Sequence, residues 1–158
     1  MLACSWLTPV GILTLVLRKS SCTFEYSVCL LGNNRTGIGP ESFAFVSSDG
    51  DFTGDGSPSL TQLAFNQKNG FYITSSVYIL RPEVLESNFY AFRVTGDAKY
   101  LRRAARVIDS FNNYLTVTHG FAGLVDVNGV NSNKIDDTES FWFAEVLKYL
   151  YVFDAKDC

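Results

Sequence analysis

The clearest periodic pattern in the chain predicts an amphipathic helix from Ala98 to about Leu115. Polar and charged residues gather on one side of this stretch, which is typical of a solvated helix face. Those polar residues are Arg102, Arg103, Arg106, Asp109 and Asn113. The apolar stripe on the other side, which we expect to face the core, consists of Tyr100, Leu101, Ala104, Ile108, Phe111 and Leu115.

A second helix is predicted from about residue 83 to Thr95, following an extended segment that ends at Leu80. Pro82 falls in its first turn, where the missing N–H of proline costs nothing. One face carries Glu83, Glu86, Ser87 and Tyr90, and the opposite, core-facing stripe is Val84, Leu85, Asn88, Phe89 and Phe92. Thr95-Gly96-Asp97 ends this helix and caps the next, so the two helices should form an antiparallel hairpin.

The last predicted helix runs from Glu139 to about Phe153, with Asp137 or Thr138 as its cap. By helical periodicity, one face carries Phe141, Glu145, Lys148 and Val152, and the opposite face carries Phe143, Val146, Leu147 and Leu150. A flat aromatic ring one turn from a carboxylate suits a sugar site, although a phenylalanine such as Phe141, taken alone, is more often a core residue.

The remaining segments predict short extended pieces and loops. Phe43 to Val46 and residues 71–80 read as extended, residues 60–70 as weakly helical, and Asn128-Gly129 as a β-hairpin turn. The loop at residues 47–59 begins like an EF-hand calcium loop, but its twelfth position is Leu60, which cannot supply a bidentate carboxylate. The sequence therefore predicts a mainly helical protein with a small β-hairpin and long loops.

Composition limits the classes of partner. The 158 residues, 47% of them apolar, can bury one core, and a net charge of −3 gives no reason to expect a nucleic acid or an anionic membrane. Aromatic residues make up 15% of the chain, which favours packing between helices and, secondarily, stacking against sugars.

The N-terminal segment 1–32 has few structural signals. Its apolar run, Trp6 to Leu17, is too short to cross a bilayer and has no basic residue ahead of it, so we interpret it as a mispredicted or truncated start rather than a targeting signal. The four cysteines, Cys4, Cys22, Cys29 and Cys158, form no zinc motif with the single His119. Asn34-Arg35-Thr36 is an N-glycosylation sequon, meaningful only in the secretory pathway.

The candidate chemistry centres on Arg81, Glu83 and Glu86. Two carboxylates one helical turn apart, behind an arginine at the helix mouth, could form an acid/base cluster. The alternative is a solvated helix start, because acidic residues are favoured in any first turn.

Three motifs resemble the class I α-1,2-mannosidases, the inverting enzymes of glycoside hydrolase family 47. They are TGIGPESFAF (36–45), whose form is similar to fungal secretory members, LRPEVLESNFYAFRVTGD (80–97) and SFWFAEVLKYLY (140–151). The resemblance runs from Thr36 to Phe153 and corresponds to the C-terminal third of a family domain. We therefore divide the chain into a non-family segment, 1–32, and the C-terminal part of a mannosidase catalytic domain, 33–158.

The resemblance implies a partial α/α barrel, a fragment of a seven-hairpin toroid, and a substrate with terminal α-1,2-linked mannose on high-mannose N-glycans. It implies that Glu83 is the catalytic base and that Glu41 is an active-site carboxylate. Arg81, Glu86, Phe141 and Glu145 match substrate-binding positions. It also implies a secretory location, in the endoplasmic reticulum or Golgi lumen or outside the cell, with membrane attachment only through an N-terminal anchor absent from this chain.

The departures from the family pattern are also informative. The leading candidate for the general acid belongs to helices N-terminal to this sequence. The family's Ca²⁺ is bound directly by a Thr in a TEAHP-like segment that this chain does not contain. Glu83, Glu86 and Glu145 could therefore contact calcium only through water, which should hold the ion poorly. The resemblance also implies a disulfide between Cys29, or as a poorer fit Cys22, and a cysteine upstream of this sequence.

The few hairpins of this chain cannot close the barrel, so we expect it to be inactive alone. Two other classes remain open: a non-catalytic mannose-binding remnant, and a structural helical-hairpin module whose Glu83 and Glu86 are first-turn carboxylates.

Overall fold

The computed structural model describes residues 35–47, 49–54 and 56–154. The apolar run Trp6 to Leu17, the four cysteines and Asn34 of the sequon lie outside the described residues.

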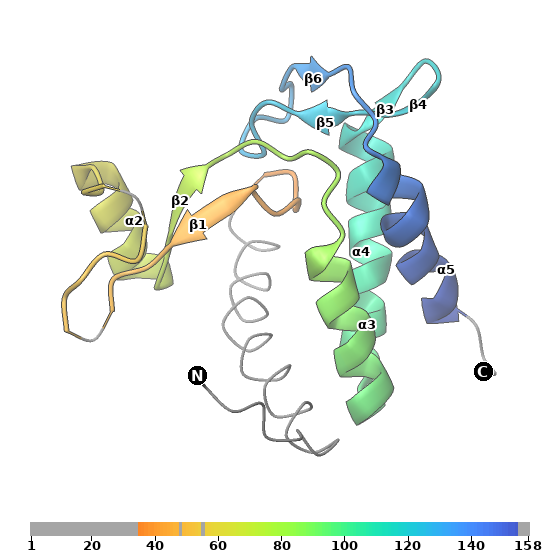
Figure 1. Cartoon of the computed structure of the whole chain (residues 1–158), viewed down its shortest axis with the longest axis horizontal. Helices are drawn as coiled ribbons and strands as arrows, with labels where there is room; N and C mark the ends of the chain where they lie inside the picture. The colour runs from red at the N-terminus through yellow and green to blue at the C-terminus, as the bar shows by residue number, and fades with distance from the viewer. Residues whose placement is uncertain (1–34, 48, 55, 155–158) are drawn as a thin grey trace, which may run out of the picture.

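Three helices form the body of the molecule. Helix α3 (Glu83–Thr95) and helix α4 (Ala98–Tyr114) lie antiparallel, and the C-terminal helix packs beside both (Figure 1). The C-terminal helix consists of a π-helical segment, η1 (Trp142–Leu147), followed by α5 (Lys148–Asp154). The predicted helical hairpin is thus confirmed. Among the described residues, no helix has the length and apolarity needed to cross a membrane.

The turn between α3 and α4 follows from its sequence. Gly96 adopts φ +67°, the left-handed conformation that glycine tolerates best, and its N–H closes the last turn of α3 on the carbonyl of Phe92 at 2.8 Å. The carboxylate of Asp97 then accepts from the N–H of Lys99 at 2.8 Å, which caps α4. These two residues fix the reversal of the chain.

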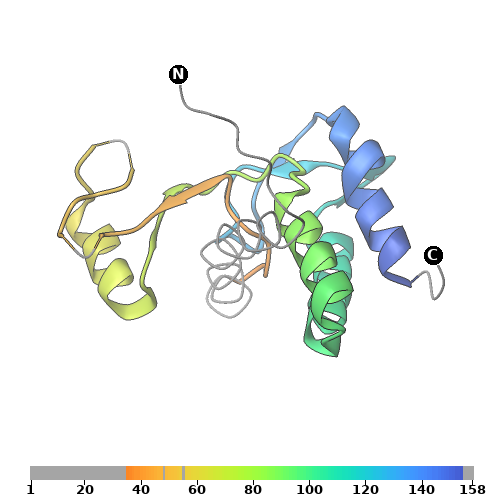
Figure 2. The same ribbon diagram turned by 60° about the horizontal axis from the view of Figure 1, so that its bottom comes forward.

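Short antiparallel strand pairs extend from one end of the helices. Strand β1 (Ser42–Ala44) pairs with β2 (Tyr72–Ser75), and the ribbon they form reaches toward helix α2 (Leu60–Asn69) on the far side of the molecule (Figures 1 and 2). The Ser59 hydroxyl and the Gln62 side chain cap α2 reciprocally. Strand β3 (Thr116–Val117) pairs with β4 (Gly120–Phe121), and β5 (Gly123–Leu124) pairs with β6 (Lys134–Ile135).

The predicted hairpin at Asn128-Gly129 is present but has a longer connection than a two-residue turn. Strands β5 and β6 flank residues 125–133, within which the N–H of Gly129 bonds the carbonyl of Asp126 at 3.3 Å. The connection is longer because Val127 turns inward and is fully buried, which ties its middle to the core.

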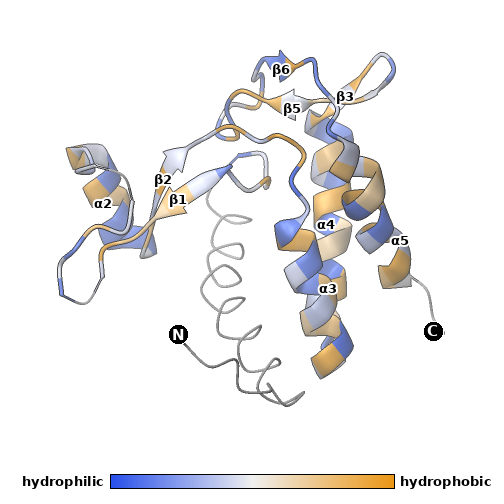
Figure 3. Cartoon of the chain, viewed as in Figure 1, coloured by the Kyte–Doolittle hydropathy of each residue, from blue (hydrophilic) through white to orange (hydrophobic). Residues whose placement is uncertain are grey.

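The core lies between the three helices and the strand pairs that close one end of them. Trp142 is its largest buried residue, and its ring contacts Phe111 and Phe121 at centroid distances of 5.3 and 5.0 Å. Apolar and polar residues divide between different faces of α3, α4 and α5 (Figure 3). The buried cluster comprises Ile38, Tyr78, Leu80, Leu85, Ala104, Val107, Phe111, Leu115, Leu124, Val127, Trp142, Val146, Tyr149 and Phe153.

The predicted core stripe of α4 is partly wrong. Tyr100, Ala104, Phe111 and Leu115 are buried as expected, but Leu101 and Ile108 are exposed. Val107 lies inside instead. The buried stripe is narrower than the apolar pattern because α3 and the C-terminal helix cover only one side of α4.

The buried stripe of the C-terminal helix coincides with neither of its two predicted faces, of whose residues only Val146 is buried. Phe143 is 64% exposed and Leu147 is exposed, whereas the buried stripe is Trp142, Val146, Tyr149 and Phe153. A π-helical segment has more residues per turn than an α-helix, so the apolar face shifts along the sequence. The expected cap also differs, because the Thr138 hydroxyl donates to the carbonyl of Phe121 at 3.0 Å.

We predict that Gly123→Ala destabilises the fold by about 1–3 kcal/mol. Tyr78 and Leu124 exchange two backbone hydrogen bonds of 2.9 Å, and a Cβ on Gly123 would lie 2.5 Å from the Tyr78 carbonyl oxygen. Urea denaturation followed by circular dichroism measures the change. Gly129→Ala is the matched control, since its Cβ would meet only ordinary contacts from 3.6 Å. Equal stabilities for the two variants would contradict the prediction.

Candidate active site

The entry into α3 is set by an unusual backbone conformation at Leu80. This residue has φ +65°, although it is not glycine, and its side chain is fully buried in the core. A left-handed conformation at such a residue costs roughly 1–2 kcal/mol and persists only where the surroundings enforce it. Here the buried Leu80 side chain and the Tyr78–Leu124 bridge enforce it. The chain therefore turns sharply, and Arg81 follows at the mouth of α3.

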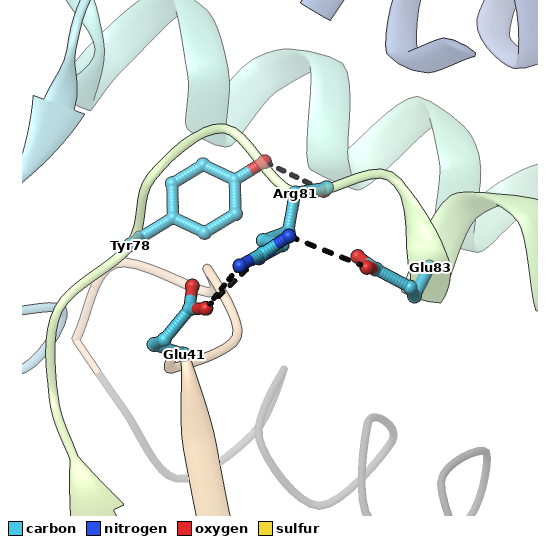
Figure 4. A network of polar contacts seen from close by, with 4 residues as sticks. All are labelled: Glu41, Tyr78, Arg81 and Glu83. Carbon is cyan, nitrogen blue, oxygen red and sulfur yellow. Dashed lines mark hydrogen bonds and ion pairs between the residues drawn. The ribbon is translucent and has the colours of Figure 1, made fainter. Parts of the chain in front are cut away.

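Arg81 lies between two carboxylates. Its Nε donates to Oε1 of Glu41 at 2.8 Å, its Nη2 forms an ion pair with the same oxygen at 2.8 Å, and its Nη1 lies 3.9 Å from Oε1 of Glu83 (Figure 4). Its guanidinium carbon also lies 5.4 Å from the ring centroid of Phe141. One side chain thus connects the loop before β1, the first turn of α3 and the start of the C-terminal helix.

Glu41 is held firmly at one oxygen. Its backbone N–H donates to the carbonyl of Val77 at 2.6 Å, which fixes the loop that carries it. Oε1 receives one hydrogen bond and one ion pair from Arg81, whereas Oε2 is buried and has no hydrogen-bond partner among the described residues. A shielded carboxylate oxygen without a partner carries a desolvation cost, which a hydroxyl or water donor would relieve.

The electrostatics of the cluster favour its charged arginine. The hydrogen bond that Arg81 donates to Glu41, more than any other contact, raises the pKa of Arg81 above its usual value. Burial raises the pKa of Tyr78, and the nearby charges of Glu83 and Glu41 raise it further. Tyr78 therefore stays neutral, and its hydroxyl donates to the carbonyl of Arg81 at 3.2 Å (Figure 4).

A cavity of about 500 Å³ adjoins this cluster. Its size falls within the range of small-molecule sites, and polar groups gather at the part formed by Glu41, Arg81 and Glu83. The rest of the lining is mainly apolar and consists of Ile38, Gly39, Pro40, Phe43, Tyr78, Val84, Leu85, Val107 and Phe111.

Glu86 belongs to a separate pair. Its Oε1 accepts a hydrogen bond of 2.8 Å from the Tyr149 hydroxyl on α5. Burial raises the pKa of Tyr149, and the hydrogen bond to Glu86 adds to the shift. No hydrogen bond or ion pair joins Glu86 to Glu41, Arg81 or Glu83 within the described residues, so the structure ties Glu86 to α5 instead.

The structure brings some of the predicted site residues together and leaves others apart. Glu41, Arg81, Glu83 and Phe141 form one contact group. Glu145 is half-buried in the π-helical segment, where its side chain makes no hydrogen bond or ion pair with another described residue. Such π-helical segments occur frequently at functional sites.

Sequence reasoning missed three contributors to the site. The Tyr78 hydroxyl donates a hydrogen bond to the Arg81 carbonyl, and the Tyr149 hydroxyl donates one to Glu86. Glu139 adds a negative charge near Arg81. In a regular α-helix, Tyr149 would lie on the same face as Glu145, four residues earlier, and this spacing could have pointed to it. The π-helical segment changes the number of residues per turn, so the spacing does not predict the shared face here.

The described residues do not fit a directly bound calcium ion. They contain no group of three or more His, Cys, Asp or Glu side chains that could hold a metal. Glu83 instead faces the cation of Arg81, and Glu86 accepts from Tyr149. Water-mediated contacts of Glu83, Glu86 and Glu145 with calcium stay a prediction, and we derive no chemical step through the ion.

Comparisons with known proteins agree on one family. Residues 19–157 match the family model described as glycosyl hydrolase family 47. This match begins inside the segment 1–32, so the division of the chain at residue 32 stays a prediction. The mannosyl-oligosaccharide α-1,2-mannosidase 1B of Aspergillus phoenicis is 48% identical over 139 residues, covering 87% of this chain and 25% of that protein.

Two further relatives extend the comparison. The enzyme of the same name from Emericella nidulans is 47% identical over 118 residues, covering 74% of this chain and 22% of that protein. The solved α-1,2-mannosidase from Trichoderma reesei superposes with a TM-score of 0.76 at 37% identity, covering 94% of this chain and 31% of that structure. The chain spans about a quarter of the length of the curated relatives it matches.

We predict that Tyr149→Phe makes stability less sensitive to alkaline pH. An unfolded tyrosine has a pKa of about 10, and the folded pKa of Tyr149 is raised. Its contribution to stability is therefore complete below about pH 10 and is lost as the pH rises toward the folded pKa. The variant should lose about 1 kcal/mol at neutral pH, through the missing hydrogen bond, and show a shallower decline above pH 10.

Urea denaturation across neutral to alkaline pH measures both effects. Tyr151→Phe is the matched control, because Tyr151 is 79% exposed on the same helix. Parallel pH profiles for wild type and Tyr149→Phe would contradict the prediction, because the titration of Tyr149 would then contribute nothing to the alkaline loss of stability.

Proposed function

The chain belongs to glycosyl hydrolase family 47, and we propose that it is the C-terminal part of an inverting α-1,2-mannosidase that trims high-mannose N-glycans. The names of the relatives, which are mannosyl-oligosaccharide α-1,2-mannosidases, support the substrate class. The observation that carries the proposal is the position of Arg81 between Glu41 and Glu83 beside the cavity.

The geometry suits Glu83 for the role of base. Inversion needs one carboxylate to activate water on the face of the sugar opposite the leaving oxygen, which a second carboxyl group protonates. The side chain of Glu83 is 58% exposed, so water reaches it, and Arg81 orients it from one side. The proton donor for the leaving oxygen would come from a part of the enzyme that this chain does not contain.

Glu41 is suited to holding a sugar hydroxyl near Glu83. Arg81 binds its Oε1, while its Oε2 is buried and has no hydrogen-bond partner among the described residues, so a sugar hydroxyl would bond Oε2 only after displacing the groups that cover it. The guanidinium lies between Glu41 and Glu83 and so separates the two carboxylates.

We propose substrate-binding roles for the remaining matched residues. Glu86 and Glu145 would accept hydroxyl protons, and Phe141 would offer an aromatic surface to the sugar. Arg81 already covers one face of the Phe141 ring, so a sugar could stack on that face only if Arg81 moved.

The exposed faces of the helices support the view that further helices belong to the working enzyme. Phe143 and Tyr151, on the C-terminal helix, are 64% and 79% exposed. Monomeric proteins rarely leave such aromatic side chains uncovered in a row. We infer that the complete enzyme closes over this face in an α/α barrel, that it works in the secretory pathway where high-mannose glycans are found, and that residues outside this chain bind its calcium.

A mannose-binding remnant without catalysis is the second candidate. The pairing of Arg81 with Glu41 and the adjoining cavity are complete within the described residues, whereas the proposed proton donor is not part of the chain. Binding could therefore survive where hydrolysis does not.

We predict that the purified chain with added calcium releases no mannose from a high-mannose glycan. The measurement is chromatography of the released sugar. In parallel, calorimetry with mannose distinguishes the two candidates, because saturable binding that is lost in Phe141→Ala would favour the remnant. Clear turnover by the wild-type chain would contradict the prediction of inactivity.

We also predict that residues 36–153 restore activity when they replace the matching segment of the Aspergillus phoenicis relative. In that chimera, Glu83→Gln should lower kcat by roughly 10²–10⁴-fold, the usual contribution of a catalytic base. Asp51→Asn is the matched control, because Asp51 is exposed and does not line the cavity. A chimera that folds but is inactive, or that tolerates Glu83→Gln, would refute the catalytic proposal.

A further inference from the structure

A second hollow, of about 310 Å³, lies against the polar side of α4. One wall is a row of α4 side chains spaced three or four residues apart: Arg106, Asp109, Ser110 and Asn113, with Tyr114 beside them. The other wall is the segment Arg35, Thr36 and Gly37. None of these residues lines the Glu41–Arg81 cavity, so the two sites are separate.

The wall that faces α4 is anchored to the core. Thr36 is buried, its hydroxyl donates to the carbonyl of Val127 at 2.6 Å, and the N–H of Ile38 donates back to that hydroxyl at 3.3 Å. The Tyr114 hydroxyl donates to the carbonyl of Arg35 at 3.4 Å. These bonds keep the backbone of the segment against α4, so Arg35 and Arg106 line the same hollow.

The polar groups of the hollow have unused hydrogen-bonding capacity. Within the described residues, the side chains of Arg35, Arg106, Asp109, Ser110 and Asn113 make no hydrogen bond or ion pair with one another or with any other described residue. Helix residues three apart can pair, yet Arg106 and Asp109 do not. The hollow thus holds two guanidinium groups, one carboxylate and several neutral donors.

The charge of the hollow is opposite to that of the chain. Two arginines and one aspartate leave it positive, whereas the whole chain carries −3. Arg102 and Arg103 lie one turn earlier on α4 and add to the positive potential, whereas Lys99 is paired with Asp97 at 3.0 Å. Two guanidinium groups in one concavity repel each other unless an anion lies between them, so the arrangement favours an anionic occupant.

We propose that this hollow binds a phosphate monoester that carries a hydroxyl group. Guanidinium forks bind phosphate oxygens in pairs, and here the two arginines belong to two different walls of the hollow, so each could contact different oxygens of a tetrahedral anion. Ser110 and Asn113 add neutral donors. The Asp109 carboxylate, which cannot bind the anion, accepts a hydrogen bond from the hydroxyl of the ester.

Nuclear magnetic resonance on the full chain tests the proposal with inorganic phosphate and then glycerophosphate, at constant ionic strength. We expect saturable shifts of the amides of residues 35–37, 106, 110 and 113, with tighter binding of glycerophosphate. Arg106→Gln should weaken binding at least about tenfold, since it removes one charged fork. Arg102→Gln, on the same helix but outside the hollow, is the matched control and should change affinity less than about twofold.

The Asp109→Asn variant distinguishes binding of the phosphate group of the ligand from binding of its hydroxyl group. It should strengthen the binding of inorganic phosphate, because a negative charge is removed, and reduce the preference for glycerophosphate. All variants change exposed or half-exposed side chains, and unchanged amide spectra away from the hollow establish that they fold.

Vesicles distinguish a free ester from a lipid headgroup. The chain is sedimented with phosphatidylcholine vesicles that contain phosphatidic acid. Sedimentation that depends on Arg106 and is absent without phosphatidic acid would identify a lipid headgroup as the ligand. Saturable binding of glycerophosphate without sedimentation would identify a free ester. No saturable shift, or equal weakening by Arg102→Gln and Arg106→Gln, would overturn the proposal, because the attraction would then be absent or diffuse.

Discussion

The pairing of Arg81 with Glu41 is the contact on which the arrangement of the candidate active site depends. It joins a loop and a helix mouth that lie forty residues apart in sequence. Both side chains are partly exposed, and exposed ion pairs contribute little to stability, about 0–1 kcal/mol. Its importance is therefore geometric. A hydrogen bond and an ion pair to one carboxylate oxygen fix the direction of Glu41, leave its buried second oxygen without a hydrogen-bond partner among the described residues, and keep the guanidinium near Glu83 and Phe141.

This geometry is imposed by the core rather than by the charged residues themselves. Tyr78 is locked to Leu124 by two backbone hydrogen bonds, and the fully buried Leu80 then accepts a left-handed backbone conformation. The hydrophobic burial of that side chain, worth about 1.5–3 kcal/mol, is enough to offset the conformational cost. Arg81 consequently leaves the core in one direction, and the site needs no flexible loop to hold its arginine.

The sequence patterns correctly predicted the features that depend on residues close together in the chain. The α3–α4 hairpin, the glycine at its turn and the Asp97 cap follow from nearby residues alone. Glu41, Arg81 and Phe141 entered the candidate site through three separate motifs that resemble the family. The left-handed Leu80, the Tyr149–Glu86 hydrogen bond and the burial of Val107 instead of Ile108 depend on which elements meet in space. Periodicity could not foresee them. The phase of the C-terminal helix was wrong for the same reason, since no residue pattern announced the π-helical segment.

Because of the π-helical segment, the directions of the side chains in the C-terminal helix depend on the exact number of residues in that segment. Each residue of an α-helix advances the chain by about 100° around the axis. Deleting one residue within Trp142–Leu147 and restoring regular α-helix would therefore rotate everything beyond it by more than a quarter of a circle. Tyr149 would then lose its hydrogen bond to the carboxylate of Glu86, while the contact between Phe141 and Arg81 stayed in place. The extra residue of the π-helical segment thus sets the rotation between the two ends of the helix. Because of it, Phe141 at one end meets Arg81 and Tyr149 further along meets Glu86.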